Sequence, residues 1–251
     1  MSQNIREFLL SARQDGRRLS MVTCYDAAFA EICQEAGIDL LLVGDSVANA
    51  VLGYAKTAQI GMGEMLHHTA AVRRGSPSSR IVTDLPFGSD ELPETAVPNG
   101  LALMAAGADA VKLEGAKLDS VRALVAAGVP VVAHLGLLPQ TATSLKQAGK
   151  NPEEAAQILK DATDLAQAGA SAVVLEHIPT PLAAEITQKL AIPTIGIGAG
   201  GECSGQVLVL HDLLGLSARR PPFAKAFVDL RKLALEGLVS YHQAVTTRQF
   251  P

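Results

Sequence analysis

The sequence contains no tryptophan, and aromatic residues make up only 4% of its 251 residues. The core must therefore be built from Ala, Val, Ile and Leu rather than from aromatic rings. Charged residues are also scarce, at 18% against about 25% in an average soluble domain. Because 48% of the residues are hydrophobic, the chain has enough apolar surface for a large core, which excludes intrinsic disorder.

Positive charge is not in excess, since 21 Lys and Arg residues face 25 Asp and Glu residues and give a net charge of -4. No basic stripe is present that could hold phosphate backbones, so nucleic-acid binding is excluded. Long apolar runs are missing as well, because charged residues or histidine interrupt each one before the ~18 residues that a membrane helix needs. No membrane association is expected.

Cysteine is rare: Cys24, Cys33 and Cys203 form neither a Cys-x-x-Cys pair nor a zinc-binding spacing. An odd, sparse set of this kind argues against a disulfide framework and fits a reducing compartment. The apolar run near the N-terminus covers only residues 8–10, too few for a signal-peptide core. We therefore expect a cytoplasmic protein.

A repeated pattern organises the chain: an Ala-rich helical segment ends in Ala-Gly, and a short apolar run follows at once. Glycine suits the left-handed position just past a helix, and a run of Val, Ile and Leu is typical of a strand buried on both faces. The pattern occurs four times and, in a form without the glycine, a fifth time. With three further apolar runs, the candidate strands lie within 21–26, 36–45, 80–86, 106–115, 127–136, 168–177, 190–200 and 208–216.

Eight parallel strands in about 250 residues predict a (β/α)8 TIM barrel, with an open doubly wound sheet as the alternative. The alternative lacks support, because no Gly-x-Gly-x-x-Gly turn follows the first strand and GIGAGG (196–201) comes near the end of the chain. No linker divides the sequence, so we predict one domain over 1–251 with C-terminal helices. The expected helices are 27–36, 61–74, 91–106, 118–127, 152–168 and 180–190, with helical segments within 222–246.

Ionisable residues stand at the ends of five apolar runs: Asp45, Asp84, Glu114, His134 and Glu176. In a barrel these positions meet at the C-terminal face of the strands, where active sites form. For any single carboxylate, capping of the next helix is an equally good explanation. All five together indicate a functional site.

Side-chain alternation along a strand places Lys112 on the same face as Glu114, and Val43 on the same face as Asp45. The three carboxylates would repel one another at the barrel mouth unless a cation lay among them. Ligands that offer only oxygen favour Mg²⁺ over Zn²⁺. An ion pair between Lys112 and Glu114 is the alternative explanation for these charges.

Several motifs give the sequence a family resemblance, and they occur in order between about residues 20 and 230: LLVGDS (41–46), HHTAAVRRG (67–75), DLPF (84–87), VKLEG (111–115), HLGL-x-PQ (134–140), VLE-x-x-P (174–179), IPTIGIGAG (192–200) and GQVLVLHD (205–212). Together they resemble ketopantoate hydroxymethyltransferases. The resemblance implies a (β/α)8 barrel of the phosphoenolpyruvate/pyruvate superfamily and a homo-oligomer, typically a homodecamer.

The resemblance also implies a reaction, in which a hydroxymethyl group passes from 5,10-methylenetetrahydrofolate to 3-methyl-2-oxobutanoate and gives 2-dehydropantoate. A 2-oxo acid chelated to Mg²⁺ loses a proton from C3, and the resulting enolate attacks the one-carbon unit. Glu176 is expected to be the general base. The implied metal ligands are Asp45, Asp84 and Glu114, and the implied substrate-binding residues are Asp45, Ser46, Asp84, Lys112 and His134.

Some segments depart from the family pattern, above all the loop at 141–151, which is shorter and lacks a Gly-rich run. Two other functions therefore stay open. One is a related enzyme that makes or breaks a C–C bond in a 2-oxo acid, although such enzymes typically use a loop cysteine that has no match here. The other is a non-catalytic paralogue that only binds a ligand.

Overall fold

The computed structural model describes residues 4–144 and 146–250. The chain divides into two compact units, Met1–Val207 and Leu208–Pro251. The first unit contains nearly all of the strands and all of the ionisable residues singled out above. The arrangement of the whole chain as one domain stays a prediction.

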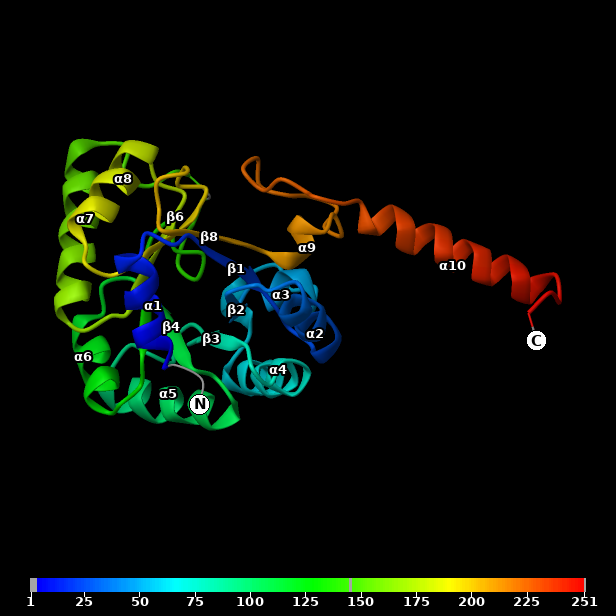
Figure 1. Ribbon diagram of the computed structural model, residues 1–251, viewed down its shortest axis with the longest axis horizontal. Helices are drawn as coiled ribbons and strands as arrows, with labels where there is room; N and C mark the ends of the chain where they lie inside the picture. Colours follow the sequence, from blue (N-terminus) through cyan, green and yellow to red (C-terminus); the bar gives the residue numbers. More distant parts are fainter. Residues whose placement is uncertain (1–3, 145, 251) are drawn as a thin grey trace. The chain divides into compact units, whose positions relative to one another are not determined.

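The strands form a closed barrel in which each strand lies beside its successor in the sequence, and neighbouring strands pair in parallel from β1 to β8 (Figure 1). This order confirms the predicted (β/α)8 barrel and excludes the doubly wound sheet. The strands are β1 (Leu19–Thr23), β2 (Leu40–Val43), β3 (Arg80–Asp84), β4 (Ala110–Glu114), β5 (Val131–Gly136), β6 (Ala172–Glu176), β7 (Thr194–Ile197) and β8 (Gly205–Leu208).

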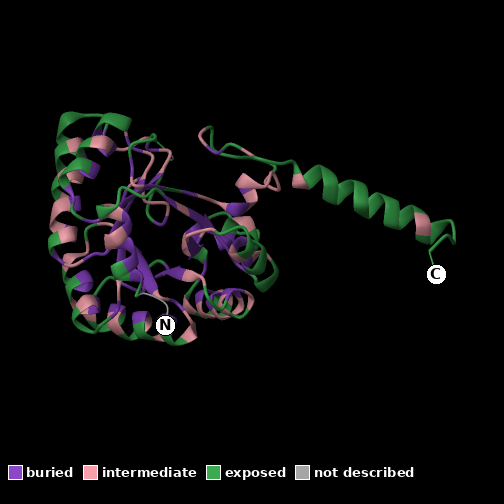
Figure 2. Ribbon diagram, viewed as in Figure 1, coloured by how far each residue is buried: buried purple, intermediate pink, exposed green. Residues whose placement is uncertain are grey.

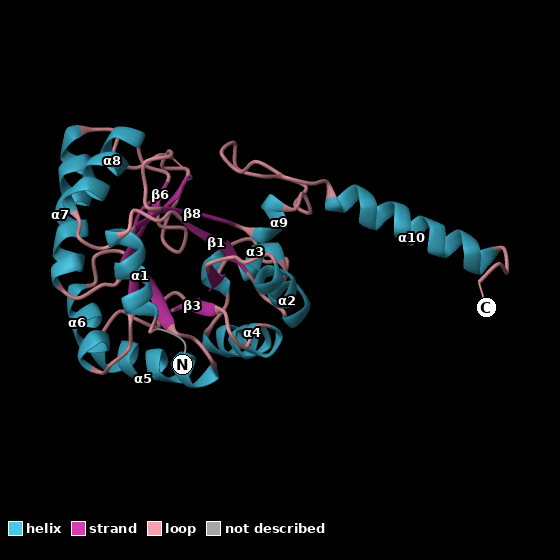
Figure 3. Cartoon of the chain, viewed as in Figure 1, coloured by secondary structure: helices cyan, strands magenta, loops and turns pink. Residues whose placement is uncertain are grey.

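Helices connect the strands along the outside of the barrel (Figure 3). Six of them begin within two residues of their expected starts: α2 (Ala27–Glu35), α4 (Met62–Gly75), α5 (Pro93–Ala106), α6 (Leu118–Ala126), α7 (Pro152–Gln167) and α8 (Thr180–Lys189). The others are α1 (Ile5–Gln14), α3 (Val47–Ala50), the 3-10 helix η1 (Thr57–Gln59), α9 (Leu210–Leu213) and α10 (Leu230–Thr246). None of the helices within 4–144 and 146–250 has the length and apolar composition needed to cross a bilayer.

The Ala-Gly repeat acts as the sequence predicts. Its glycines, Gly37, Gly107, Gly128 and Gly169, all have positive φ, between 73° and 116°. In this left-handed conformation a side chain would be strained, so glycine lets each helix end sharply and the chain turn into the next strand.

Two expectations from the sequence need correction. The eighth strand is not within 208–216, because β8 ends at Leu208 and residues 210–213 form α9. Leu210, Leu213 and Leu214 recur at helical spacing, and this periodicity indicates a helix better than the apolar composition of the segment indicates a strand. The sequence reading also left out α1, although Ile5, Phe8, Leu9 and Ala12 have the same helical spacing.

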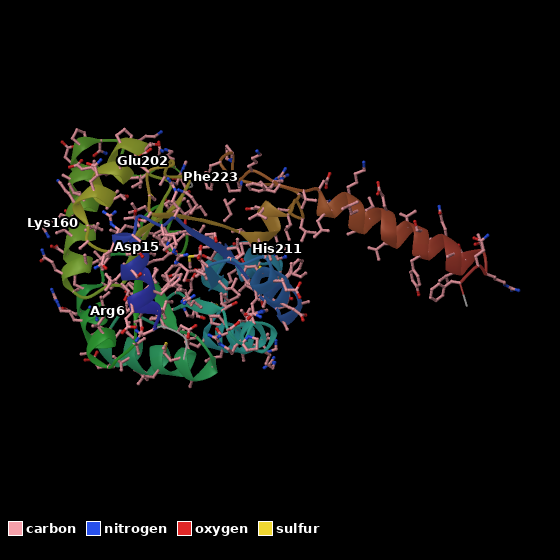
Figure 4. The ribbon with its side chains drawn as sticks, in the orientation of Figure 1. Arg6, Asp15, Lys160, Glu202, His211 and Phe223 are labelled. Carbon is pink, nitrogen blue, oxygen red and sulfur yellow. The ribbon has the colours of Figure 1, made fainter. Side chains whose placement is uncertain are left out.

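Helix α1 closes the N-terminal end of the barrel, and Figure 4 labels Arg6 in its first turn and Asp15 just after its last residue. Its apolar face belongs to the same buried cluster as residues that point inward from the strands. Figure 2 shows the buried strands at the centre of this unit. The inward residues of the cluster are Leu19, Met21, Leu40, Leu42, Val82, Ala110, Val132, Ala172, Val174, Ile195 and Val207.

The second unit ends in α10, a helix of 17 residues in which no residue is buried (Figure 2). Several large apolar side chains on this helix are more than half exposed, among them Leu233, Leu235, Leu238 and Tyr241. A helix that exposes so much apolar surface is typical of an interaction surface.

If α1 is part of the barrel core, Leu9→Ala should reduce the free energy of unfolding by about 2–5 kcal/mol, since Leu9 is only 1% exposed. The neighbouring exposed residue provides the control, and Glu7→Ala should change stability by less than about 0.5 kcal/mol. Urea unfolding followed by circular dichroism measures both. Equal stability of the two variants would contradict the role of α1.

Candidate active site

The centre of the candidate site is an ion pair between neighbouring strands. Asp84 is the last residue of β3, and the register of the barrel places it opposite Lys112 of β4. The Lys112 Nζ lies 2.9 Å from Asp84 Oδ1, and both side chains are at most 5% exposed. The sequence left open an ion pair between Lys112 and Glu114, but the carboxylate closest to Lys112 belongs to Asp84.

A second chain of contacts crosses β4, β5 and β6. His134 lies opposite Glu114 in the register, with its Nδ1 3.4 Å from Glu114 Oε1, and its Nε2 lies 3.2 Å from Glu176 Oε2. The Glu176 side chain is 17% exposed, whereas those of Glu114 and His134 are 3–4% exposed. Glu176 is thus the member of this chain that solvent or a ligand reaches most easily.

Asp45 reaches the same centre by a different route from the one predicted. Alternation would pair it with Val43, but Leu40 and Leu42 are the residues of β2 that join the interior cluster. The strand ends at Val43, so the turn that follows, not the pleat, directs Asp45 inward. The Asp45 backbone N–H donates to Asp84 Oδ2 at 3.0 Å.

The structure adds two residues that the sequence analysis did not single out. Gln140 donates from its side chain to Asp45 Oδ2 at 2.8 Å and from its backbone to Glu114 Oε2 at 3.1 Å. The Tyr25 hydroxyl lies 2.8 Å from Ser46 Oγ. Gln140 ends the motif HLGL-x-PQ, and Tyr25 lies in the first apolar run. These positions were the only features of the sequence that could have pointed to the two residues.

Crowding of charge changes the ionisation of the aspartates. Burial, together with the nearby charge of Asp84, raises the pKa of Asp45 to about 7. Burial also raises the pKa of Asp84, although the charge of Lys112 and the Asp45 N–H act against this shift. The Lys112 pKa is raised, because the surrounding carboxylates outweigh its burial. The site therefore holds more negative charge than Lys112 neutralises.

The histidine is held in its charged form. Burial and Lys112 disfavour an imidazolium, but the close contacts with Glu114 and Glu176 prevail and raise the pKa of His134 to about 9. Burial would raise the pKa of Glu114, yet the hydrogen bond and charge of His134 keep it below its usual value. His134 Nδ1 also lies 3.4 Å from Lys112 Nζ, so the imidazole lies between this lysine and the two glutamates.

The aspartates fit a magnesium ion. Both offer only oxygen atoms, they are adjacent, and the raised pKa of Asp45 shows negative charge that a divalent cation would neutralise. Mg²⁺ usually takes one or two carboxylates and fills its other positions with water or substrate. Across the described part of the chain, no three His, Cys, Asp or Glu side chains surround one metal position, since Glu114 faces His134 and Gln140 instead.

Comparison with known proteins identifies the family. The family model described as ketopantoate hydroxymethyltransferase matches residues 4–251. The chain belongs to the ketopantoate hydroxymethyltransferase family. A 3-methyl-2-oxobutanoate hydroxymethyltransferase of Ignicoccus hospitalis is 47% identical over 97% of this chain and 95% of its own length. One of a Cyanothece species is 49% identical over 95% of each chain.

Solved structures with the same fold are much more distant in sequence. A putative phosphonomutase from Burkholderia cenocepacia has a TM-score of 0.69 at 17% identity, covering 84% of this chain and 95% of its own. A phosphonopyruvate hydrolase, solved with oxalate and Mg²⁺, has a TM-score of 0.66 at 14% identity, covering 96% and 98%. A 2,3-dimethylmalate lyase of the PEP mutase/isocitrate lyase superfamily also matches, with a TM-score of 0.61 at 16% identity, covering 99% and 88%. These likenesses show that the chain shares the barrel fold of these structures.

Removing the charge of Lys112 should destabilise the barrel in a pH-dependent way. In Lys112→Met, Asp84 loses its partner, and its folded pKa moves further above the unfolded value of about 3.9. An acid with a raised folded pKa loses stability as pH rises, so the loss should reach roughly 3–5 kcal/mol at about pH 8 and be smaller at about pH 5.

Metal-free urea unfolding at the two pH values measures this difference. Lys189→Met is a suitable control, because Lys189 pairs with Glu185 on an exposed helix surface and its side chain is 54% exposed. Equal destabilisation of Lys112→Met at both pH values would show that the buried ion pair does not control the ionisation of Asp84.

Proposed function

We propose that this protein is a 3-methyl-2-oxobutanoate hydroxymethyltransferase. The enzyme transfers a hydroxymethyl unit to 3-methyl-2-oxobutanoate, so that 5,10-methylenetetrahydrofolate and water are consumed and 2-dehydropantoate and tetrahydrofolate are formed. One observation carries the proposal: Glu176, the most exposed carboxylate of the network, lies 3.2 Å from His134, whose other ring nitrogen is 3.4 Å from the buried Lys112. Removal of a proton from the carbon next to a keto group requires a base and nearby groups that stabilise the negative charge that forms.

Substrate binding is assigned to the residues around the ion pair. The carboxylate and keto oxygens of a 2-oxo acid carry negative charge, which Lys112 attracts from its position beside Asp84. The hydroxyl of Ser46, positioned by Tyr25, donates to the acid from the turn after β2. His134 contributes a second positive charge next to the reacting carbon.

Magnesium is assigned to Asp45 and Asp84, with Glu114, which contacts His134 and Gln140, acting through water. When bound, Mg²⁺ supplies Lewis-acid stabilisation of the negative charge that grows on the keto oxygen. Gln140 orients the Asp45 carboxylate through its 2.8 Å hydrogen bond. Lys112 neutralises part of the negative charge of the aspartates and favours their ionised forms, and a bound cation would neutralise more of it.

Glu176 removes the proton from C3 of the substrate. His134 Nε2 lies 3.2 Å from one oxygen of the Glu176 carboxylate, and we assign the other oxygen to accept the proton. Glu114 holds the opposite side of the imidazole and fixes its orientation. After proton removal, the C3 carbon attacks the one-carbon unit of the folate.

Backbone packing fixes the place of Glu176. The Leu137 N–H donates to the Glu176 carbonyl at 2.8 Å. The residue before Leu137 is Gly136, the last residue of β5, and it lies so close to β6 that a Cβ there would collide with the same carbonyl. Gly136 has φ of 98°, which glycine alone adopts without strain.

The loop at 141–151 follows β5, and we assign it to folate binding and closure of the site.

The protein is further proposed to work in the cytoplasm as a homo-oligomer, a homodecamer in line with the family resemblance. Support for association comes from α10, whose apolar side chains include Leu235 and Leu238 at 61% and 67% exposure. Support for a reducing compartment comes from the cysteines, all three of which are buried and free.

The assay that tests the proposal is formation of 2-dehydropantoate from the two substrates with and without Mg²⁺. Activity should require the metal, and Asp45→Asn should lower the rate by at least about a hundredfold, because a charged ligand is lost. Asp39→Asn is the matched control: Asp39 stands before β2, at the opposite end of the barrel, and pairs with Arg17. Metal-independent product formation, or equal rates for both variants, would contradict the assignment.

A further inference from the structure

A cavity of about 540 Å³ lies at the N-terminal end of the barrel, away from the site described above. It lies where α1, the turn before β3 and the starts of β4 and β5 meet. Its lining includes Ile5, Arg73, Ser79, Arg80, Met104 and Asp109. The volume falls within the range of small-molecule sites, and the lining combines apolar and charged groups.

Arg80 is the residue that gives this cavity its chemistry. It is the first residue of β3, and alternation places it on the same face as Val82 and Asp84, so its side chain enters the closed end of the barrel. The guanidinium lies over the ring of Phe8, with Cζ 3.6 Å from the ring centre. Its Nε is buried and has no hydrogen-bond partner among the described residues.

The neighbouring arginines differ because each has a carboxylate. Arg17 lies over the same Phe8 ring, at 4.6 Å, but pairs with Asp39 at 2.6 Å. Arg73 pairs with Asp109 at 2.6 Å and donates to several backbone carbonyls. Within the part of the chain that the structure describes, Arg80 forms no ion pair, so the cavity lining has one positive charge without a partner.

An unpaired, half-buried guanidinium is costly, because burial removes water without supplying a counter-charge. Burial and the charge of Arg17 lower the pKa of Arg80, and the charges of Asp109 and Asp39 offset this shift only in part. Asp39 and Asp109, the carboxylates whose charges act on Arg80, already pair with Arg17 and Arg73, so the cavity can take a further anion.

We infer that this cavity binds a small anion through Arg80. The planar guanidinium donates two parallel hydrogen bonds to a carboxylate or a phosphate, which makes these groups its preferred ligands. Ile5 and Met104 favour a ligand with an apolar part beside the anionic group. The site lies roughly 13 Å from the Asp84 end of β3, given about 3.3 Å per residue, so it is separate from the proposed substrate site.

Equilibrium dialysis of the full chain against radiolabelled orthophosphate tests this inference. The buffer should contain no metal, because Mg²⁺ at Asp45 and Asp84 could itself recruit phosphate. The unmodified protein should bind one phosphate per chain, and Arg80→Gln should weaken binding at least tenfold. Arg17→Gln is the matched control, since it removes an arginine from the same aromatic ring but not from the cavity, and it should bind as the unmodified protein does.

Ser79→Asp provides a second variant if Arg80→Gln fails to fold. It places a carboxylate at the cavity without altering Arg80, and it should also weaken phosphate binding at least tenfold. Displacement of the label by glycerol 3-phosphate at lower concentration than by malonate would assign a phosphate ligand, and the reverse order a carboxylate ligand. Unchanged binding in Arg80→Gln or Ser79→Asp, equal loss in Arg17→Gln, or no phosphate binding at all would overturn the inference.

Discussion

The ion pair between Lys112 and Asp84 is the interaction on which the site depends. Without a positive charge among them, three carboxylates could not stay ionised in an interior with such low exposure. The pair joins adjacent strands, β3 and β4, and the Asp45 N–H binds the other Asp84 oxygen, so the barrel itself fixes the geometry. The proposed Mg²⁺ would neutralise the charge that Lys112 leaves uncompensated on the aspartates.

Most of the barrel follows from the sequence because its signals are local. Each Ala-Gly pair marks a helix end, and the apolar run after it is long enough to be a buried strand, as the positive φ of Gly37 and Gly169 confirms. β8 does not follow from such a signal, since it is four residues long and includes exposed Gln206. Closure of the barrel, a long-range effect, forms this strand despite its weak pattern.

The residues of the site could be predicted from the sequence, but the contacts between them could not. Parallel strands carry whatever follows them to one face, so Asp84, Glu114, His134 and Glu176 could be brought together from sequence alone. The partner of each side chain could not, because a contact such as Lys112 with Asp84 depends on register between strands that are 28 residues apart in sequence. Gln140 was missed because an amide carries no charge and its role appears only when the loop after β5 folds back over Asp45.

The two ends of the barrel use arginine, lysine and carboxylates in contrasting ways. At the C-terminal end, negative charge is in excess and fits a cation, whereas at the N-terminal end Arg80 is in excess and fits an anion. β3 carries both, with Arg80 as its first residue and Asp84 as its last. One strand therefore links the proposed catalytic centre to the cavity beneath α1.

The central claim is that Glu176 takes the proton from C3 of 3-methyl-2-oxobutanoate, and hydrogen exchange tests it without any contribution from folate. Proton NMR in D₂O follows replacement of the C3 hydrogen by deuterium in the presence of Mg²⁺. The unmodified protein should catalyse this exchange, and Glu176→Gln should slow it by at least about a hundredfold. Absence of exchange by the unmodified protein with Mg²⁺ bound, or an unchanged rate in Glu176→Gln, would contradict the account.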